Sequence, residues 1–145
     1  MEQTITTNLE AEKSAASLNK PRILIVDDDE VYRKMMVRYF ERMGIDAVAA
    51  QSGEEALAIL HAESRPIALI LLDIAMPYLN GFDFARMVRS ESEFADLTIV
   101  AVTARKGMDV DAEASDAGIN RVITKPPDPS TIRNLCVELG LIEES

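Results

Sequence analysis

Polar residues follow four short apolar runs of the sequence at the point where each run ends. They are Asp27 and Asp28, Asp73, Thr103 and Lys125. Three carboxylates brought together repel each other by roughly 3 kcal/mol per close pair, at an effective dielectric constant of about 20 and a separation of about 5 Å. Lys125 supplies one positive charge, and a hard divalent cation could supply the rest. Mg²⁺ (or Mn²⁺) suits such a site, because it prefers oxygen ligands and pairs carboxylates with phosphate oxygens.

A metal-bound carboxylate beside an ammonium and a hydroxyl is suited to phosphoryl transfer onto the carboxylate itself, a known form of covalent catalysis by Asp. In this scheme Asp73 is the nucleophile. The cation and Lys125 neutralise charge on the equatorial phosphoryl oxygens, and Thr103 donates its hydroxyl to a third oxygen. The residue types therefore predict an acidic, cation-binding site for phosphoryl transfer.

Each of these residues also has an ordinary structural explanation. The acidic run at residues 27–29 could cap the helix that follows it. Asp73 could begin a turn, Thr103 could be a strand threonine, and Lys125 could be a solvated charge. The joint pattern favours a site, because separate explanations do not account for complementary chemistry at the end of every internal strand.

Alternating strand and helix patterns separate these residues, which is typical of βαβ units. The patterns predict five strands, at about residues 23–26, 46–50, 67–72, 97–102 and 121–124. They also predict five helices, at about residues 32–43, 53–60, 82–89, 107–117 and 129–139. The expected fold is therefore α/β, a doubly wound, flavodoxin-like, five-stranded parallel sheet with right-handed crossovers.

The expected strand order explains how the polar residues meet. In doubly wound sheets, ligands bind outside the carboxyl ends of the strands, where the strand order reverses. With the order 2-1-3-4-5, the first, third, fourth and fifth strands are neighbours, and the second lies at the edge and contributes no polar residue. We therefore expect the five side chains to share one pocket.

Residues at two helix starts fit capping patterns. Ser52 can cap the second helix while Glu55 reaches back in a capping box. Asp128 and Pro129 suit the cap and the first residue of the last helix.

The remaining residues of chemical interest receive structural roles. Met35, Met36 and Met43 fit the inner stripe of the first helix, and Cys136 is expected to pack as a small hydrophobe. His61 is the only histidine. We place it at the surface, away from the strand ends, so it is not expected to act as a catalytic or relay histidine.

Composition restricts the partners and the location. The chain has 145 residues, a formal net charge of −10 and a pI near 4.5, which argues against direct nucleic-acid binding, because that depends on clustered Lys and Arg. A single cysteine and the lack of a charged-then-apolar leader favour the cytoplasm. The longest apolar run, residues 67–72, is far shorter than the roughly 20 residues of a membrane helix. We expect no membrane contact.

The composition of the sequence changes from mostly polar to alternating apolar and polar segments near residue 21. Residues 1–20 are mostly polar and are predicted to form a flexible tail. Residues 21–145 are expected to form one domain, with no segment left for an output domain.

The polar residues lie in motifs that resemble the response-regulator receiver domain, over about residues 22–139. The motifs are Ile25-Val26-Asp27-Asp28-Asp29, Leu71-Leu72-Asp73-Ile74-Ala75-Met76-Pro77, Asn80-Gly81, Val102-Thr103-Ala104 and Ile123-Thr124-Lys125-Pro126. Each motif alone is weak, but the ordered set is highly specific. The chain resembles a single-domain, chemotaxis-regulator-like member of two-component systems.

The resemblance implies a signalling phosphoprotein that catalyses only its own phosphorylation and dephosphorylation. Asp73 would accept the phosphoryl group from a sensor histidine kinase or a histidine phosphotransfer protein. Asp27 and Asp28 would hold Mg²⁺ together with Asp73 and the backbone carbonyl of Ala75. The peptide bond between Lys125 and the following proline is expected to be cis.

The resemblance also implies an output. Phosphorylation would draw Thr103 toward the phosphoryl group and change the surface around the fourth helix and fifth strand, where a downstream protein would bind. A homodimer through the fourth helix, fifth strand and fifth helix is compatible with the resemblance. Val122 stands where many members carry Tyr or Phe, so switching is expected to depend on Thr103 and the neighbouring loop. Ala75 and Arg105 occupy positions that influence phosphoryl lifetime.

Two other functions remain open on the sequence. A small-molecule or flavin-binding domain of the same fold class should have Gly, Ser or Thr after its first strand, so that backbone amides can hold a phosphate. The acidic run at residues 27–29 opposes that function. A receiver that serves only as a protein-binding scaffold is opposed, though not excluded, by the presence of all five site residues.

Overall fold

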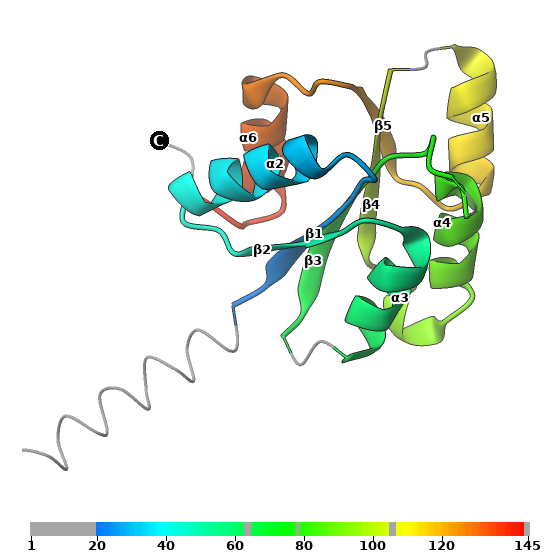
Figure 1. The fold of residues 1–145 in the computed structure, drawn as a ribbon, viewed down its shortest axis with the longest axis horizontal. Coiled ribbons are helices and arrows are strands. Elements are labelled where there is room, and N and C mark those ends of the chain that lie inside the picture. Colours follow the sequence, from blue (N-terminus) through cyan, green and yellow to red (C-terminus); the bar gives the residue numbers. More distant parts are fainter. Residues whose placement is uncertain (1–19, 63–64, 78, 105–106, 144–145) are drawn as a thin grey trace, which may run out of the picture.

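The computed structural model describes residues 20–62, 65–77, 79–104 and 107–143. Across these residues a parallel sheet lies between two layers of helices (Figure 1). The strands are β1 (Arg22–Val26), β2 (Ala47–Ala50), β3 (Ile67–Leu72), β4 (Thr98–Thr103) and β5 (Arg121–Thr124). The helices are α2 (Glu30–Arg42), α3 (Gly53–Ala62), α4 (Gly81–Arg89), α5 (Met108–Asp116) and α6 (Pro129–Glu138), with a 3₁₀ turn, η1 (Ser92–Phe94). Residues 1–19 of the predicted tail, and Arg105, lie outside the described residues.

The strand order is β2-β1-β3-β4-β5, as predicted, and every neighbouring pair is parallel. The three central strands are buried on both faces over most of their length. Strands covered by helices on both sides need apolar residues at successive positions, which is why these runs are not alternating. The continuous apolar runs therefore predicted a sheet with two covered faces, and the structure confirms it.

Alternate residues of each central strand enter different cores. On one face, Leu24 and Ile70 pack with the inner sides of α3, α4 and α5. On the other face, Ile25 and Leu71 pack with α2 and α6, where Phe40 is fully buried. The two cores hold the sheet between the helix layers, and the parallel pairing of β1 with β3 and of β3 with β4 sets the register of their carboxyl ends.

Side-chain caps begin four of the described helices, including α4, where Oδ1 of Asn80 accepts from the amide of Asp83. The carboxylate of Asp29 accepts hydrogen bonds from the backbone amides of Val31 and Tyr32 at the start of α2. The hydroxyl of Ser52 accepts from the amide of Glu55 at the start of α3, and Asp128 caps α6, with Pro129 as its first residue. The predicted caps at Ser52 and Asp128 are confirmed. In the acidic run at 27–29, capping is the role of Asp29.

One expectation about the helices was wrong, and one short turn was not predicted. Met35 was assigned to the core, but it is 51% exposed, whereas Met36 is buried. Met35 precedes Met36 and lies about 100° away from it around the helix axis, so the two cannot both face the sheet. The turn η1 was also not predicted, because three residues carry no periodicity.

Arg89, at the end of α4, joins three segments at the amino ends of β4 and β5. Its guanidinium donates to the backbone carbonyls of Gly118 and Phe94, at 2.9 and 2.8 Å, and to Oδ1 of Asn120 at 2.9 Å. The same Asn120 oxygen accepts from the amide of Ile99 at 2.8 Å. Arg89 thus fixes the carboxyl end of α5 to α4.

None of the described helices is both long and apolar enough to cross a membrane. Cys136 is free and fully buried in α6, as the sequence predicted.

Burial raises the pKa of the Cys136 thiol to about 11, so at pH 8 only about one thiol in a thousand is ionised. We expect Ellman's reagent to leave the folded protein almost unreacted and to titrate one thiol after denaturation in guanidinium. A rapid stoichiometric reaction of the folded protein would contradict this packing.

Candidate functional site

Three carboxylates meet at the carboxyl ends of β1 and β3. Asp27, Asp28 and Asp73 each offer one carboxylate oxygen, and these oxygens lie within 4.8 Å of one another. Asp27 is 1% exposed and Asp73 is 8% exposed, whereas Asp28 is open to solvent. The predicted acidic cluster is therefore present, half enclosed by the sheet and half accessible from outside.

The strand register brings these carboxylates together. Val26, the last residue of β1, is paired with Leu72, the last residue of β3. The amide of Asp73 then donates to the carbonyl of Val26 at 2.9 Å, and the amide of Asp27 donates to the carbonyl of Ala50 at 3.1 Å. Because both aspartates directly follow paired strand ends, their side chains emerge at the same edge of the sheet.

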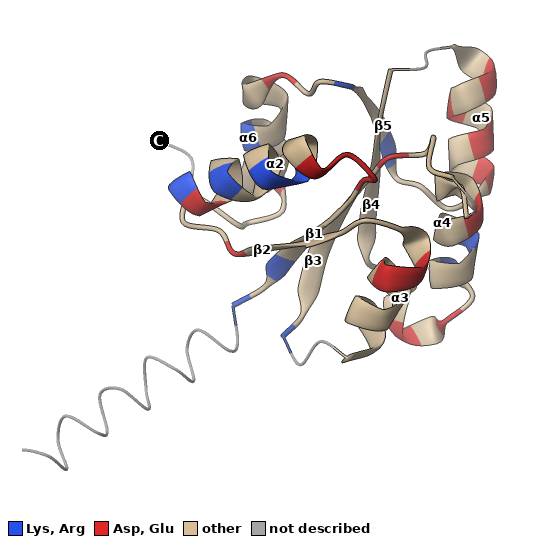
Figure 2. Cartoon of the chain, in the orientation of Figure 1, with Lys and Arg blue, Asp and Glu red and all other residues tan. Residues whose placement is uncertain are grey.

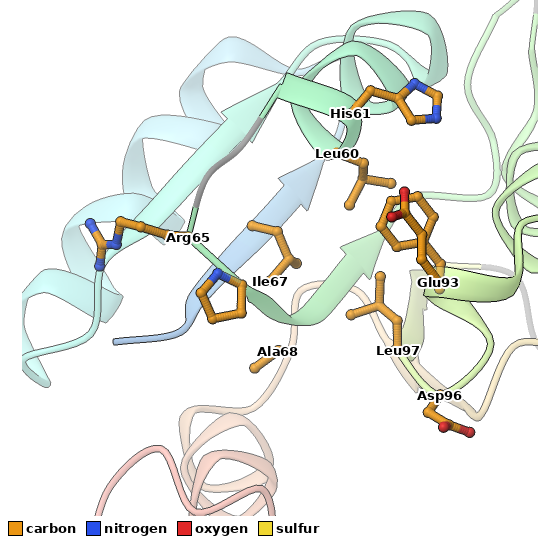
Figure 3. A pocket seen from close by; sticks show the side chains of 10 residues that line it. Leu60, His61, Arg65, Ile67, Ala68, Glu93, Asp96 and Leu97 are labelled. Atoms are coloured by element: carbon orange, nitrogen blue, oxygen red, sulfur yellow. The ribbon is translucent and has the colours of Figure 1, made fainter. Parts of the chain in front are cut away.

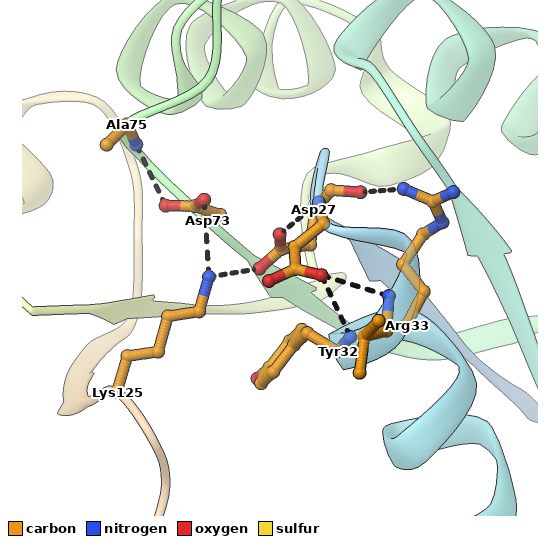
Figure 4. Close-up of polar contacts among 8 residues, drawn as sticks. Asp27, Tyr32, Arg33, Asp73, Ala75 and Lys125 are labelled. Carbon is orange, nitrogen blue, oxygen red and sulfur yellow. Dashed lines mark hydrogen bonds and ion pairs between the residues drawn. The ribbon is translucent and has the colours of Figure 1, made fainter.

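Lys125, which follows β5, reaches across β4 to this acidic cluster (Figure 4). Its Nζ lies 2.7 Å from Oδ2 of Asp27 and 3.6 Å from Oδ2 of Asp73. Burial alone would lower the pKa of Lys125, but the hydrogen bond and charge of Asp27, with the charge of Asp73, outweigh burial and raise that pKa. Lys125 is therefore held as an ammonium between two carboxylates.

Asp27 is bound from several directions. Besides the contact with Lys125, its Oδ1 accepts from the amide of Asp29 at 2.9 Å, and its backbone carbonyl accepts from Nη1 of Arg33 at 2.8 Å. Burial raises the pKa of the Asp27 carboxyl, and the hydrogen bonds from Lys125 and Asp29 offset this only in part. A further positive charge near Asp27 would stabilise its ionised form.

Asp73 is oriented by its own loop. Oδ1 of Asp73 accepts from the amide of Ala75 at 3.0 Å, which leaves Oδ2 on the side of Lys125. Gly81, the first residue of α4, lies against this segment, because a Cβ atom there would come within 2.5 Å of the Cα of Ile74 and 2.9 Å of the carbonyl oxygen of Asp73. Only glycine lets α4 approach the Asp73 backbone this closely.

Thr103 lies at the end of β4, one residue later than the predicted strand end. It is 2% exposed and is paired with Thr124 of β5. Its carbonyl accepts from the amide of Lys125 at 3.0 Å. The backbones of Thr103 and Lys125 are thus joined at the same edge of the sheet that carries the acidic cluster.

The peptide bond between Lys125 and Pro126 is cis, as the resemblance implied. Val122, at the position where many receivers carry an aromatic residue, packs partly buried against the core beneath α3, α4 and α5.

The donor set fits a hard divalent cation. The three carboxylates supply oxygen ligands in mutual reach, and Asp28 keeps one side of the cluster open to water. The ammonium of Lys125 contacts two of them, and one positive charge against three carboxylates leaves negative charge in excess. Mg²⁺ uses one or two carboxylates and retains waters for the remaining positions, so these side chains match its requirements.

A separate hollow of about 430 Å³ lies at the amino ends of β3 and β4 and is lined by residues such as His61, Ile67 and Leu97 (Figure 3). Nε2 of His61 pairs with Glu91 at 2.8 Å, and the histidine side chain is 50% exposed. None of the clustered carboxylates lines this hollow. His61 therefore lies at the surface, as predicted.

Two residues that touch the site were not predicted to do so. Nη1 of Arg33 binds the backbone of Asp27, and the ring of Tyr32 lies below Nζ of Lys125 (Figure 4). Their position in the first turn of α2, directly after the acidic run, was a signal that could have drawn attention to both.

Comparison with known proteins shows the family of this chain. The family model for the response regulator receiver domain matches residues 23–136. The chain is 35% identical over 121 residues to the chemotaxis protein CheY1 of Helicobacter pylori, covering 82% of this chain and 97% of that protein. It therefore belongs to the response-regulator receiver family, whose members are signalling proteins.

Other similar proteins carry receivers in different settings. The chain is 34% identical to the CAI-1 autoinducer sensor kinase/phosphatase CqsS of Vibrio cholerae, covering 81% of this chain but only 17% of that protein. Among solved structures, a response regulator receiver protein from Pseudomonas putida matches with a TM-score of 0.76 and 30% identity, covering 82% of this chain and 97% of the other. Vibrio cholerae CheY4 matches with a TM-score of 0.76 and 26% identity, over 83% and 98% of the two chains.

The close approach of Gly81 to Asp73 predicts a specific cost. Gly81→Ala forces its methyl group against fixed backbone, and we expect it to lower the free energy of unfolding by about 1–3 kcal/mol. Gly53→Ala is the matched control, because Gly53 also begins a helix but its new methyl would meet side chains and no backbone, the end of Leu79 and, at 3.3 Å, the ring of Phe84.

Urea unfolding followed by circular dichroism measures both variants. Gly53→Ala should change the free energy of unfolding by less than about 1 kcal/mol, since removing a glycine also restricts the unfolded chain. Equal effects of the two substitutions would show that the Asp73 loop moves freely to accommodate a side chain at position 81.

Proposed function

We propose that this chain acts as a single-domain response regulator in which Asp73 accepts a phosphoryl group, and that residues 21–145 form the whole receiver. The observation that carries the proposal is the contact of Lys125 with both Asp27 and Asp73 beside the open carboxylate of Asp28. A nucleophilic carboxylate, a fixed ammonium and a cation-binding acidic pair are the groups that phosphoryl transfer to aspartate requires.

The phosphoryl donor is a phosphohistidine of a sensor histidine kinase or a histidine phosphotransfer protein. An oxygen of Asp73 forms the new bond to phosphorus while the phosphorus–nitrogen bond breaks, and the electron pair of that bond returns to the imidazole. No proton leaves Asp73, because it reacts as a carboxylate. The similarity to parts of the sensor kinases CqsS of Vibrio cholerae and CheAY of Helicobacter pylori is consistent with a kinase partner.

Each site residue has a distinct task in this proposal. Lys125 binds a phosphoryl oxygen. Its contact with Asp73 is longer than its contact with Asp27, so a small movement of the ammonium is enough to bring it to a phosphoryl group on Asp73. Thr103 donates its hydroxyl to another phosphoryl oxygen. The carboxylates of Asp27, Asp28 and Asp73, with the carbonyl of Ala75, would hold Mg²⁺ or Mn²⁺. The cation would supply positive charge to the transferring phosphoryl oxygens.

Phosphorylation of Asp73 is the direct test. We expect acetyl phosphate with Mg²⁺ to add the mass of one phosphoryl group to the intact protein, and chelation by EDTA to prevent the addition. Asp73→Asn should abolish the addition completely, because the amide is not a nucleophile. Asp116→Asn, an exposed substitution at the end of α5, is the matched control and should be phosphorylated like the wild type.

The outcomes separate the remaining functions. A mass increment that persists in Asp73→Asn would place the acceptor elsewhere. No increment with acetyl phosphate or with phosphorylated histidine proteins would favour a receiver that serves only as a protein-binding scaffold.

The output of the phosphorylated protein is binding to another protein. Thr103 and Lys125 join the site to β4 and β5, so a phosphoryl group that draws on both side chains changes the surface over α5 and β5. That surface is strongly acidic, since α5 carries Asp109, Asp111, Glu113 and Asp116 (Figure 2). Its chemistry opposes direct nucleic-acid binding and favours a protein target with basic groups. We place this exchange in the cytoplasm, consistent with the unpaired Cys136.

Beryllium fluoride, a phosphoryl mimic, tests the output. We expect it to increase capture of a downstream protein from a cell extract, or to shift the sedimentation coefficient if the partner is a second copy bound through α5, β5 and α6. Asp73→Asn is the control and should show neither change. Identical capture and sedimentation with and without the mimic would contradict phosphorylation-dependent binding.

A further inference from the structure

Tyr32 presents its ring to the ammonium of Lys125. The distance from Nζ of Lys125 to the centroid of the Tyr32 ring is 4.5 Å (Figure 4). An ammonium within about 6 Å of an aromatic centroid is attracted by the negative face of the ring, and the attraction is stronger where water is excluded. Tyr32 is only 8% exposed, so this contact is largely shielded from solvent.

The ring is a fixed support. The amide of Tyr32 donates to the capping carboxylate of Asp29 at 3.2 Å, which sets the first turn of α2. Its side chain packs in the core between the sheet, α2 and α6, together with Met36 and Ile132. A side chain held at both its backbone and its ring cannot follow Lys125 if the ammonium moves.

The hydroxyl of Tyr32 does not explain this placement. Among the described residues it is buried without a hydrogen-bond partner, an arrangement that is unfavourable for any polar group. Burial raises the pKa of Tyr32, and the charges of Asp27 and Asp73 raise it further, so the group stays a neutral phenol. The feature of Tyr32 that makes a favourable contact with the site is the face of its ring.

The contacts of Lys125 come from three different elements. Asp27 follows β1, Asp73 follows β3, and Tyr32 belongs to α2. The two carboxylates compete for the ammonium, and the shorter contact is with Asp27. The Tyr32 ring lies against the same ammonium but adds no hydrogen-bond acceptor. It therefore restricts the position of Nζ while leaving Lys125 free to bind either carboxylate.

We propose that Tyr32 is a positioning residue, whose ring keeps the ammonium of Lys125 within reach of both Asp27 and Asp73 so that it can meet the incoming phosphoryl group. This inference rests on the proposed phosphoacceptor function of Asp73. It assigns no chemistry to the tyrosine hydroxyl, and phenylalanine should therefore serve equally well.

Three variants isolate the ring. Tyr32→Phe keeps the ring and removes the hydroxyl, whereas Tyr32→Leu removes the ring. Tyr32→Met is a second ring-free variant in case the leucine protein does not fold. Tyr39→Leu is the matched control, because Tyr39 lies two turns further along α2, packs against the same core and is not in contact with Lys125 in the structure.

The first measurement needs no phosphorylation. In ¹H–¹³C spectra of protein labelled at lysine, the Hε and Cε signals of Lys125, assigned with Lys125→Arg, should carry a ring-current shift. We expect that shift in the wild type, Tyr32→Phe and Tyr39→Leu, and its loss in the ring-free variants. An unchanged shift in the ring-free variants would overturn the contact.

The second measurement is the rate of phosphorylation of Asp73 by acetyl phosphate with Mg²⁺. We expect Tyr32→Leu and Tyr32→Met to be slower by about three- to tenfold, the range expected for loss of one ammonium–ring contact. Tyr32→Phe should keep the wild-type rate. Tyr39→Leu, which also removes an aromatic ring from the same core, should remain within about twofold, so slowing confined to the ring-free Tyr32 variants separates the contact with Lys125 from a general loss of packing. Ring-free variants as fast as the wild type, or a phenylalanine variant as slow as leucine, would overturn the proposal.

The two measurements distinguish an error in the proposed function from an error in the positioning role of Tyr32. If the wild type takes up no phosphoryl group, the proposed function is wrong, and the ring-current shift alone then decides whether Tyr32 holds Lys125. If the wild type is phosphorylated but the ring-free variants keep both rate and shift, only the positioning role is wrong.

Discussion

The contact of Lys125 with Asp27 and Asp73 is the interaction on which the site depends. Its partners follow three different strands, and the lysine and Asp27 are 98 residues apart in the sequence. Three carboxylates within 4.8 Å would otherwise repel each other by about 3 kcal/mol per pair. The ammonium reduces this repulsion without removing it, so the folded chain retains an excess of negative charge at one defined position, which is the requirement for binding a cation.

The rest of the fold supplies the stability that this acidic cluster lacks. β1, β3 and β4 are almost wholly buried between two cores, and burial of aliphatic side chains stabilises a domain by roughly 25 cal/mol per Å². The polar residues of the site lie at or just beyond the strand ends, where they do not interrupt the apolar runs. The buried part of each strand stabilises the fold, and the residues at its end form the site.

The sequence was sufficient for the strand order and for the convergence of Asp27, Asp73 and Lys125, because apolar runs and their terminal residues are local features. It was less informative about helix faces and fine boundaries. β4 extends to Thr103 because Thr124 pairs with that residue, and pairing partners are not visible locally. Met35 was assigned to the core because both it and Met36 are apolar, but adjacent residues of a helix point to different faces and only the packing shows which one is buried. The contacts of Arg89 and Tyr32 join distant segments and leave no periodic signal.

The contacts of Arg89 have a mechanical consequence for α5. They hold the carboxyl end of this helix, through the carbonyl of Gly118, whereas Met108 at its amino end is 87% exposed and follows the loop that leaves Thr103. The first turn of α5 is held differently, by the apolar packing of Val110, which is 2% exposed. One end of the helix is thus anchored by directional hydrogen bonds and the other by non-directional burial, so a shift of the amino end along the core leaves the hydrogen bonds of Arg89 in place.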